Sequence, residues 1–139
     1  MNIFVAIIIA AGASVAAGAG QPSASVQKPR AVNVSGGLCR LATDGTLGVN
    51  IGPNASMPTV ALTIGPGAFM TDQKQNKAKF AGPGKYENEL IALYLGKTAF
   101  EDTYGGLGTV TIAADGKSGT FALNDGKASG SFDCGSIQK

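Results

Sequence analysis

Short alternating segments separated by glycine-rich turns are the feature that most limits the fold of this chain. After residue 30, no stretch of ten or more residues has the apolar spacing of an amphipathic helix. Asp-Gly pairs at 44–45, 115–116 and 125–126 each stand between two short segments of strand character, and each is typical of a type I′ hairpin turn. The pattern predicts an all-β chain whose neighbouring strands pair through tight turns.

The expected strands follow one another at regular spacing. The first, from Val32 to Leu41, is interrupted at Ser35-Gly36-Gly37, where a bulge or tight bend is expected. Residues 86–95 mix helix-favouring and strand-favouring residues, and the flanking glycines favour a strand. The number and spacing predict an antiparallel β-sandwich or small barrel of about seven to eight strands. The other expected strands cover residues 47–51, 59–64, 108–113, 120–123 and 128–134.

The first twenty residues contain no charged side chain and include an unbroken apolar run from Ile3 to Ala11. The run is short for a membrane span, which needs roughly 20 apolar residues. Small residues up to Gly20 offer cleavage sites, so residues 1–20 are expected to be a secretory signal peptide. Because no Lys or Arg precedes the run, an uncleaved helical anchor that contacts the membrane stays open. Residues 21–30, with two prolines, are expected to be a linker before a domain at 31–139.

The two cysteines, Cys39 and Cys134, lie near the two ends of the expected domain. In an oxidising compartment an even number of cysteines indicates disulfides, and two cysteines allow one pairing. On the last strand, Cys134 shares a face with Phe132, where a buried disulfide fits. We therefore expect a disulfide that joins the first strand to the last, and an extracytoplasmic location: secreted, periplasmic or on the outer face of a membrane.

Composition excludes several classes of chemistry. The absence of histidine excludes Ser-His-Asp and Cys-His catalysis within the chain, the usual zinc sites and histidine pH switching. Eleven basic and nine acidic residues give a net charge of +2, which is too balanced for a nucleic-acid-binding protein. Neither a cofactor nor a metal is expected.

The carboxy-terminal run GTVTIAADGKSGTFALNDGKASGSFDC, from Gly108 to Cys134, has a glycine-started strand, an Asp-Gly turn, S-G-T-F and a closing S-G-x-F-x-C. It resembles the ending of many small exported or lipid-anchored proteins of bacteria, especially actinobacteria, and covers about a fifth of the chain. The resemblance implies a cell-envelope β-sandwich and no particular activity. Unlike the lipid-anchored members, this chain has no cysteine at the end of its leader.

Candidate functional residues are few. Glu87 and Glu89 lie two apart on an expected strand, where they would share a face about 7 Å apart. Paired carboxylates can serve glycoside hydrolysis, but a solvated strand face explains them as well. Asn33 and Asn54 stand in glycosylation sequons. A possible binding surface combines a basic concentration with three tyrosines: Lys74, Lys77, Lys79, Lys85, Tyr86, Tyr94 and Tyr104.

These observations favour a non-catalytic, exported protein of the cell envelope that acts by binding or structural contact. Its partner would be an envelope protein, a glycan or a lipid. Two alternatives remain. One is an accessory subunit of a membrane complex, held by an uncleaved helix at 1–20; the other is a small hydrolase that uses Glu87 and Glu89.

Overall fold

Nine antiparallel strands form one sheet in the computed structural model, which describes residues 21–53, 58–67, 74–98 and 101–139. These residues contain no helix, so the prediction of an all-β fold is confirmed for the described part of the chain. The hydrophobic leader expected at 1–20 lies outside the described residues. The strands are β2 (Ser23–Lys28), β3 (Val32–Ser35), β4 (Gly37–Leu41), β5 (Leu47–Ile51), β6 (Thr59–Ile64), β7 (Gly84–Tyr94), β8 (Thr103–Ile112), β9 (Ser118–Leu123) and β10 (Ser129–Asp133).

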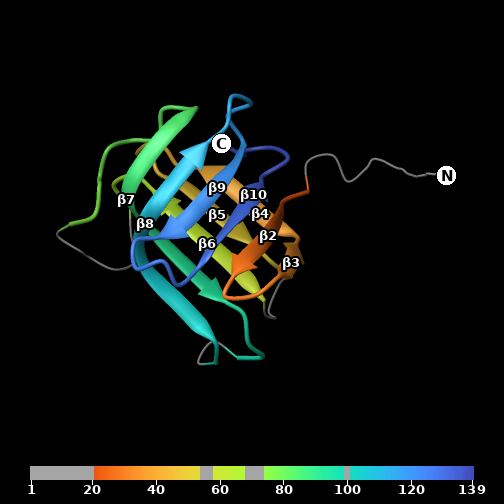
Figure 1. The fold of residues 1–139 in the computed structure, drawn as a ribbon. Helices are drawn as coiled ribbons and strands as arrows, with labels where there is room; N and C mark the ends of the chain where they lie inside the picture. Colours follow the sequence, from red (N-terminus) through yellow and green to blue (C-terminus); the bar gives the residue numbers. More distant parts are fainter. Residues whose placement is uncertain (1–20, 54–57, 68–73, 99–100) are drawn as a thin grey trace.

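The sheet curls into a nearly closed barrel (Figure 1). Its strand order is β3-β2-β10-β9-β8-β7-β6-β5-β4, so the two strands at its ends are consecutive in the chain. Only Gly36, with a positive φ of 95°, separates β3 from β4. The expected bend is therefore found, and it lets one segment pair with β2 through its first half and with β5 through its second. Of the two predicted architectures, the structure has the barrel.

The carboxy-terminal tail pairs with β4. Gln138 runs parallel to Arg40, its N–H donates to the Cys39 carbonyl at 2.9 Å, and its carbonyl accepts from the Leu41 N–H at 2.7 Å. The predicted disulfide between Cys39 and Cys134 is present, with Cα atoms 5.8 Å apart and both residues buried. The tail and the disulfide together tie β4 to the end of β10, which is not its neighbour in the sheet.

Alternate residues of the strands fill the interior of the barrel, as the two-residue period of a strand requires. On β5 and β6 the sequence alternates without interruption, and every second side chain is buried. Strands β9 and β10 contribute the two large aromatic rings of the core, Phe121 and Phe132. The fully buried aliphatic side chains include Leu47, Ile51, Val60, Leu62, Ile64, Leu93 and Val110.

The linker expected at residues 21–30 is in fact largely a strand. Residues 23–28 form β2, which lies inside the sheet between β3 and β10 (Figure 1). The prediction gave weight to the polar residues and prolines and missed the alternation of Ala24 and Val26, which are 6% and 1% exposed. The folded unit therefore begins before residue 31, and its first strand completes the curl of the sheet.

The three Asp-Gly turns are found, but they are not of type I′. That type needs a positive φ at both central residues. Among the described residues, the aspartates of these turns do not have one, whereas the glycines do. The Gly45 N–H bonds to the Ala42 carbonyl, and the Asp44 carboxylate accepts from the Thr46 N–H. Asp115-Gly116 and Asp125-Gly126 repeat this arrangement. The aspartate stabilises a type I turn that ends in a left-handed glycine.

Candidate functional site

A row of small polar side chains crosses the outer face of five adjacent strands, β8, β9, β10, β2 and β3. Successive cross-strand pairs connect its members, and neighbouring strands lie about 4.8 Å apart. The inward positions of these strands are apolar, so the alternation directs the polar residues outward. In sheet order the row consists of Thr111, Thr120, Ser131, Ser25 and Asn33.

Parallel rows on either side extend this polar surface. On one side Ser118, Ser23 and Ser35 follow the same pairing, with Asp133 between the first two. On the other side lie Thr109 and Ser129. We call the ten neutral side chains of these rows the hydroxyl face: Ser23, Ser25, Asn33, Ser35, Thr109, Thr111, Ser118, Thr120, Ser129 and Ser131.

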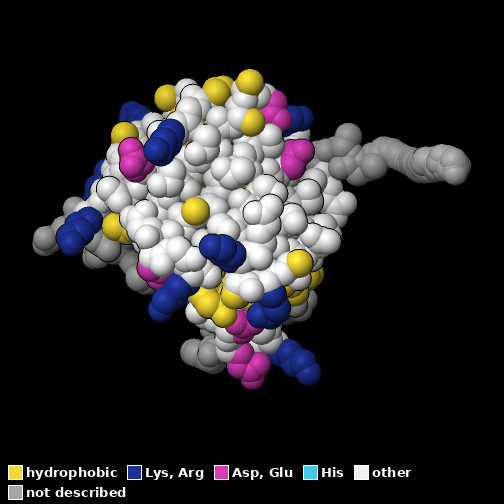
Figure 2. Space-filling view, viewed as in Figure 1, with side chains coloured by type: hydrophobic (Ala, Val, Ile, Leu, Met, Phe, Trp, Pro, Cys, Tyr) yellow, Lys and Arg dark blue, Asp and Glu magenta, His cyan; other side chains and the backbone are white. Residues whose placement is uncertain are grey.

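The hydroxyl face is hollowed in two places. The larger hollow, of about 630 Å³, lies over β3, β2, β10 and the start of β9. The smaller, of about 250 Å³, lies over β8, β9 and β10, and both are lined by Ser131. Figure 2 shows a broad area over these strands that carries few charged or hydrophobic side chains. The face is therefore polar and open, with Asp133 as the one acidic side chain among the residues that line the two hollows.

The polar groups of the hydroxyl face are largely unused by the protein. Ser118 donates to the Asp115 carboxylate at 2.7 Å. The other nine side chains have no hydrogen-bond partner in the described part of the protein. Each hydroxyl can both donate and accept a hydrogen bond, and Asn33 offers an amide that does the same. The arrangement can bind a ligand that presents many hydroxyl groups.

A bulge in β7 separates the two carboxylates that were expected to share a face. Tyr86 pairs with Val110 and Glu89 with Gly108, so Glu87 and Asn88 together face a single residue of β8. Asn88 adopts a left-handed conformation, with φ 58°, which asparagine tolerates better than most residues. The extra residue reverses the alternation. Glu87 is exposed while Glu89 points into the barrel and is fully buried, so the predicted pair does not exist.

Glu89 lies in a buried polar cluster that sequence reasoning missed. Its Oε1 accepts from the Gly65 N–H at 3.3 Å, and the Nε2 of Gln75 donates to the Gly65 carbonyl at 3.2 Å. Gln75 is 6% exposed. Two oxygens, Oε2 of Glu89 and Oε1 of Gln75, are buried without a hydrogen-bond partner. Burial raises the pKa of Glu89 to about 7, opposed only by the Gly65 N–H.

The predicted surface of lysines and tyrosines is not gathered into one site. Lys74, Lys77, Lys79 and Lys85 are exposed around the connection from β6 to β7. Tyr86 lies at this end but stacks on Phe80 with ring centroids 5.6 Å apart, and both rings pack against the core. The Tyr86 hydroxyl donates to the Gly82 carbonyl and accepts from the Ala81 N–H. The four lysines therefore remain a candidate binding surface, and the Tyr86 ring is not part of it.

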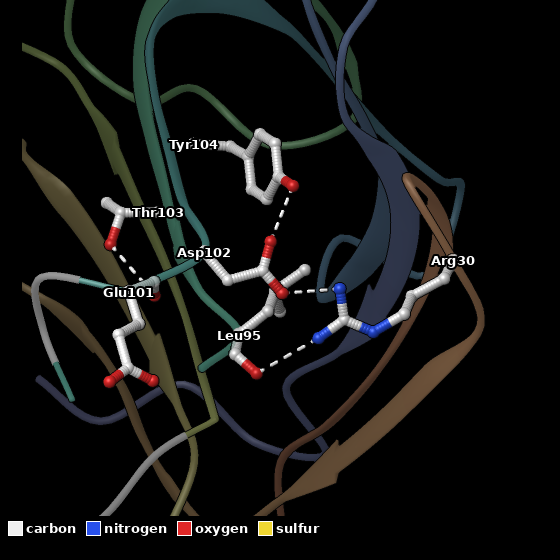
Figure 3. Close-up of polar contacts among 6 residues, drawn as sticks. All are labelled: Arg30, Leu95, Glu101, Asp102, Thr103 and Tyr104. Carbon is white, nitrogen blue, oxygen red and sulfur yellow. Dashed lines mark hydrogen bonds and ion pairs between the residues drawn. The ribbon is translucent and has the colours of Figure 1, made fainter. Parts of the chain in front are cut away.

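Tyr94 and Tyr104 lie at the opposite end of the β7–β8 hairpin, where they pair with different partners. The bulge also places Tyr94 on the outer side, away from the inward Tyr86. Tyr104 donates to the Asp102 carboxylate at 2.5 Å, and Asp102 forms an ion pair with Arg30 (Figure 3). These contacts lower the pKa of Asp102, with the tyrosine hydrogen bond as the largest cause, and raise that of Tyr104. The cluster joins the β2–β3 turn to β8.

The remaining features considered from the sequence are the two sequon asparagines, metal binding and a membrane-spanning helix. Asn33 is exposed on the hydroxyl face, whereas Asn54 lies outside the described residues. Within the described ranges, no group of three or more Cys, Asp or Glu side chains is placed to hold a metal ion. The same part of the chain contains no helix long and apolar enough to cross a membrane.

Comparison of the chain with protein-family models, curated proteins and solved structures finds no match. The function must therefore be inferred from the residues of this protein.

Proposed function

We propose that this is a non-catalytic, exported protein of the cell envelope that binds a neutral glycan through the hydroxyl face. The observation that carries the proposal is the row of five polar side chains in register across five strands, with hydroxyl and amide groups that have no partner in the described part of the protein. A glycan presents closely spaced hydroxyls that donate and accept in the same way.

The charge of the face favours a neutral ligand over an anionic one. The charged residues that pair with members of the face are Asp133, opposite Ser118 and Ser23, and Lys28, opposite Ser129 at its edge, so the face has no excess of basic groups for a phosphate, sulfate or carboxylate. Asp133, exposed between Ser118 and Ser23, adds an acceptor for sugar hydroxyls and repels anions. The aromatic residues of these strands, Tyr104, Phe121 and Phe132, lie at inward positions and pack in or against the core. Binding of a sugar would therefore depend on hydrogen bonds, and each binding site would be weak.

The disulfide supports the extracytoplasmic part of the proposal. Disulfides form and persist in oxidising compartments, where glycans of the cell envelope are found. The resemblance of the run from Gly108 to Cys134 to exported bacterial proteins points the same way.

The test is a titration of the labelled protein with neutral hexasaccharides, maltohexaose and mannohexaose, followed through backbone amide shifts. We expect shifts that cluster on β8, β9, β10, β2 and β3. The double variant Thr120→Val, Ser131→Ala removes two hydroxyls from the centre of the face and should weaken binding at least several-fold. Asn50→Ala is the matched control, because Asn50 is exposed on β5, outside the face.

Two results would contradict the proposal. One is that neither hexasaccharide shifts these strands; the other is that the double variant and the control bind equally. An anionic oligogalacturonate and vesicles with anionic lipid serve as competing probes. If they bind in place of the neutral sugars and shift residues near Lys77 and Lys85, the lysines are the contact surface instead.

A further inference from the structure

The Glu89 cluster, formed by Glu89, Gln75 and the main chain of Gly65, lies under a short segment that crosses the end of the barrel. This covering segment, residues 74–80, connects to the barrel through two backbone hydrogen bonds. The Asn76 N–H donates to the Asn88 carbonyl at 2.8 Å and the Phe80 N–H to the Gly45 carbonyl at 2.9 Å. Gln75 is its buried polar side chain, and it reaches Gly65 beside Glu89.

The hydrogen bonds of the cluster are incomplete when Glu89 is ionised. A carboxylate has only acceptor oxygens, and the cluster supplies it with one N–H, at 3.3 Å. Its Oε2 and the Gln75 Oε1 are then two buried acceptors without a donor. A proton on Glu89 changes Oε2 from an acceptor into a donor. Protonation therefore removes the buried negative charge and adds an O–H donor to a cluster in which two acceptor oxygens have none.

The charged side chains around the cluster do not compensate for an ionised Glu89. The surrounding elements carry Asp44 in the β4–β5 turn, Lys74, Lys77 and Lys79 in the covering segment, and Lys85, Tyr86 and Glu87 on β7. The β9–β10 turn, whose Asn124 bonds to Asn88, carries Asp125 and Lys127, and β8 contributes Tyr104 at its far end. All eight charged groups are exposed, and neither they nor the two tyrosines contribute to the shifted pKa of Glu89. Opening to water is the remaining way to solvate the carboxylate.

We propose that Glu89 is a proton-sensitive latch: when this buried carboxyl loses its proton, the covering segment opens and admits water to this end of the barrel. The latch is independent of the hydroxyl face, which lies on other strands. It would make the exposure of the lysine-rich segment depend on the pH outside the cell.

Trypsin cleavage after Lys77 and Lys79, both exposed within the covering segment, reports its opening. The rate is measured at pH 6 and pH 8.5 for the full chain and for Glu89→Gln, whose amide resembles the protonated acid. At each pH, the cleavage rate of the unaltered chain is divided by that of Glu89→Gln, and this ratio cancels the pH dependence of trypsin itself. If the pKa of Glu89 returns from about 7 to its usual 4.5 on opening, the ratio should rise about ten-fold over this range.

Glu87→Gln is the control, because Glu87 is exposed two residues away, and its ratio to the unaltered chain should not change with pH. Should Glu89→Gln fail to fold, carbon NMR of the Glu89 carboxyl in the unaltered chain gives a second measurement. The carboxyl and the amides of Gly65, Asn76 and Phe80 should share one midpoint near pH 7. Three results would each overturn the proposal. The cleavage-rate ratio of the unaltered chain to Glu89→Gln could stay constant with pH, or the Glu89 carboxyl could titrate with a midpoint near pH 4.5. The amide shifts of Asn76 and Phe80 could also stay unchanged while Glu89 titrates.

Discussion

At the scale of single residues, Glu89 makes the stability of the whole domain depend on pH. Its pKa is raised by burial from 4.5 to about 7, so the folded chain binds this proton more tightly than the unfolded chain. The stabilisation is fully present below about pH 4.5 and is lost as the pH rises through 7. The free energy of unfolding should fall by about 2 to 3 kcal/mol between pH 5 and pH 8 on account of this group. Urea denaturation of the unaltered chain and Glu89→Gln measures it, because the variant should lack the decline.

Asp102 should have the opposite effect on the pH dependence of stability, because its contribution to the free energy of unfolding should increase as the pH rises. Its pKa is lowered by the Tyr104 hydroxyl and by Arg30, so the stabilisation that it provides is present above its unfolded pKa and is lost as the pH falls below it. Asp102→Asn is a matched change, because asparagine tolerates the left-handed backbone at φ 53°. The melting temperature of the variant should lie below that of the unaltered chain at pH 6, and the difference should shrink progressively as the pH falls below the ordinary pKa value of 3.8. A difference that stays constant as the solution is acidified would assign the loss to something other than charge.

Strand alternation alone could not predict from the sequence that Glu89 is buried. Counting by twos from Glu87 places both carboxylates on one face, and only the bulge at Asn88 changes this. A single asparagine before the second glutamate was the available signal, since asparagine is enriched at left-handed positions. Gln75 gave no signal, because its burial depends on how a long connection crosses the end of the barrel. The outward polar residues of β8, β9 and β10 follow from strand periodicity, whereas Ser23 and Ser25 were missed together with β2. These residues form one surface only in the observed strand order.

At the scale of elements, the strands with alternating apolar residues and Asp-Gly turns were predictable because both signals are local. The covalent partner of Cys39 was predictable because only one other cysteine exists. The choice between sandwich and barrel was not, because it depends on Gly36, where the chain bends and changes sheet partner. The role of β2 was missed for a related reason: its residues are small and polar, and its place between β3 and β10 follows from closure of the sheet.

Close contact between β8 and β9 requires glycine at position 119. A Cβ there would come within 2.0 Å of the Thr111 carbonyl oxygen, a backbone atom that cannot move aside on its own. Gly119→Ala should therefore lower the free energy of unfolding by at least about 1–3 kcal/mol, the usual range for overpacking. Gly48→Ala on β5 is the control, since its nearest contact is 3.9 Å away and its φ is ordinary. Equal denaturation midpoints for the two variants would contradict this account of the contact.

Strand β2 should be essential for folding although it was expected to be a linker. It contributes the buried Ala24 and Val26 and pairs with both β3 and β10. A chain that begins at Pro29 leaves both neighbouring strands with unpaired edges and should lose its cooperative thermal transition. A chain that begins at Gln21 keeps β2 and is the control. If the shorter chain melts cooperatively at the same temperature, β2 is not part of the folding unit.

At the scale of the whole molecule, the disulfide and the tail make up for the one place where the sheet does not close. The chain pairs with β2 as β3 and turns away from it at Gly36, so the outer edge of β4 is paired through Gln138 and not through a strand. The disulfide holds the start of this tail against β4. An oxidising compartment would therefore complete the barrel, which connects the architecture to the proposed location outside the cytosol.

Removing the disulfide tests this connection between compartment and fold. The bond closes a loop with a sequence separation of 95 residues, and a loop of that size should stabilise the folded state by about 4–5 kcal/mol in the chain-entropy model. Cys39→Ala, Cys134→Ala should lower the denaturation midpoint accordingly, and reducing agent should affect the unaltered chain alone. Hydrogen exchange at the amides of Leu41 and Gln138 should speed up more than exchange within β8, because the tail depends on the disulfide and the hairpins do not. Uniform acceleration across all strands would instead mean that the bond stabilises the barrel only as a whole.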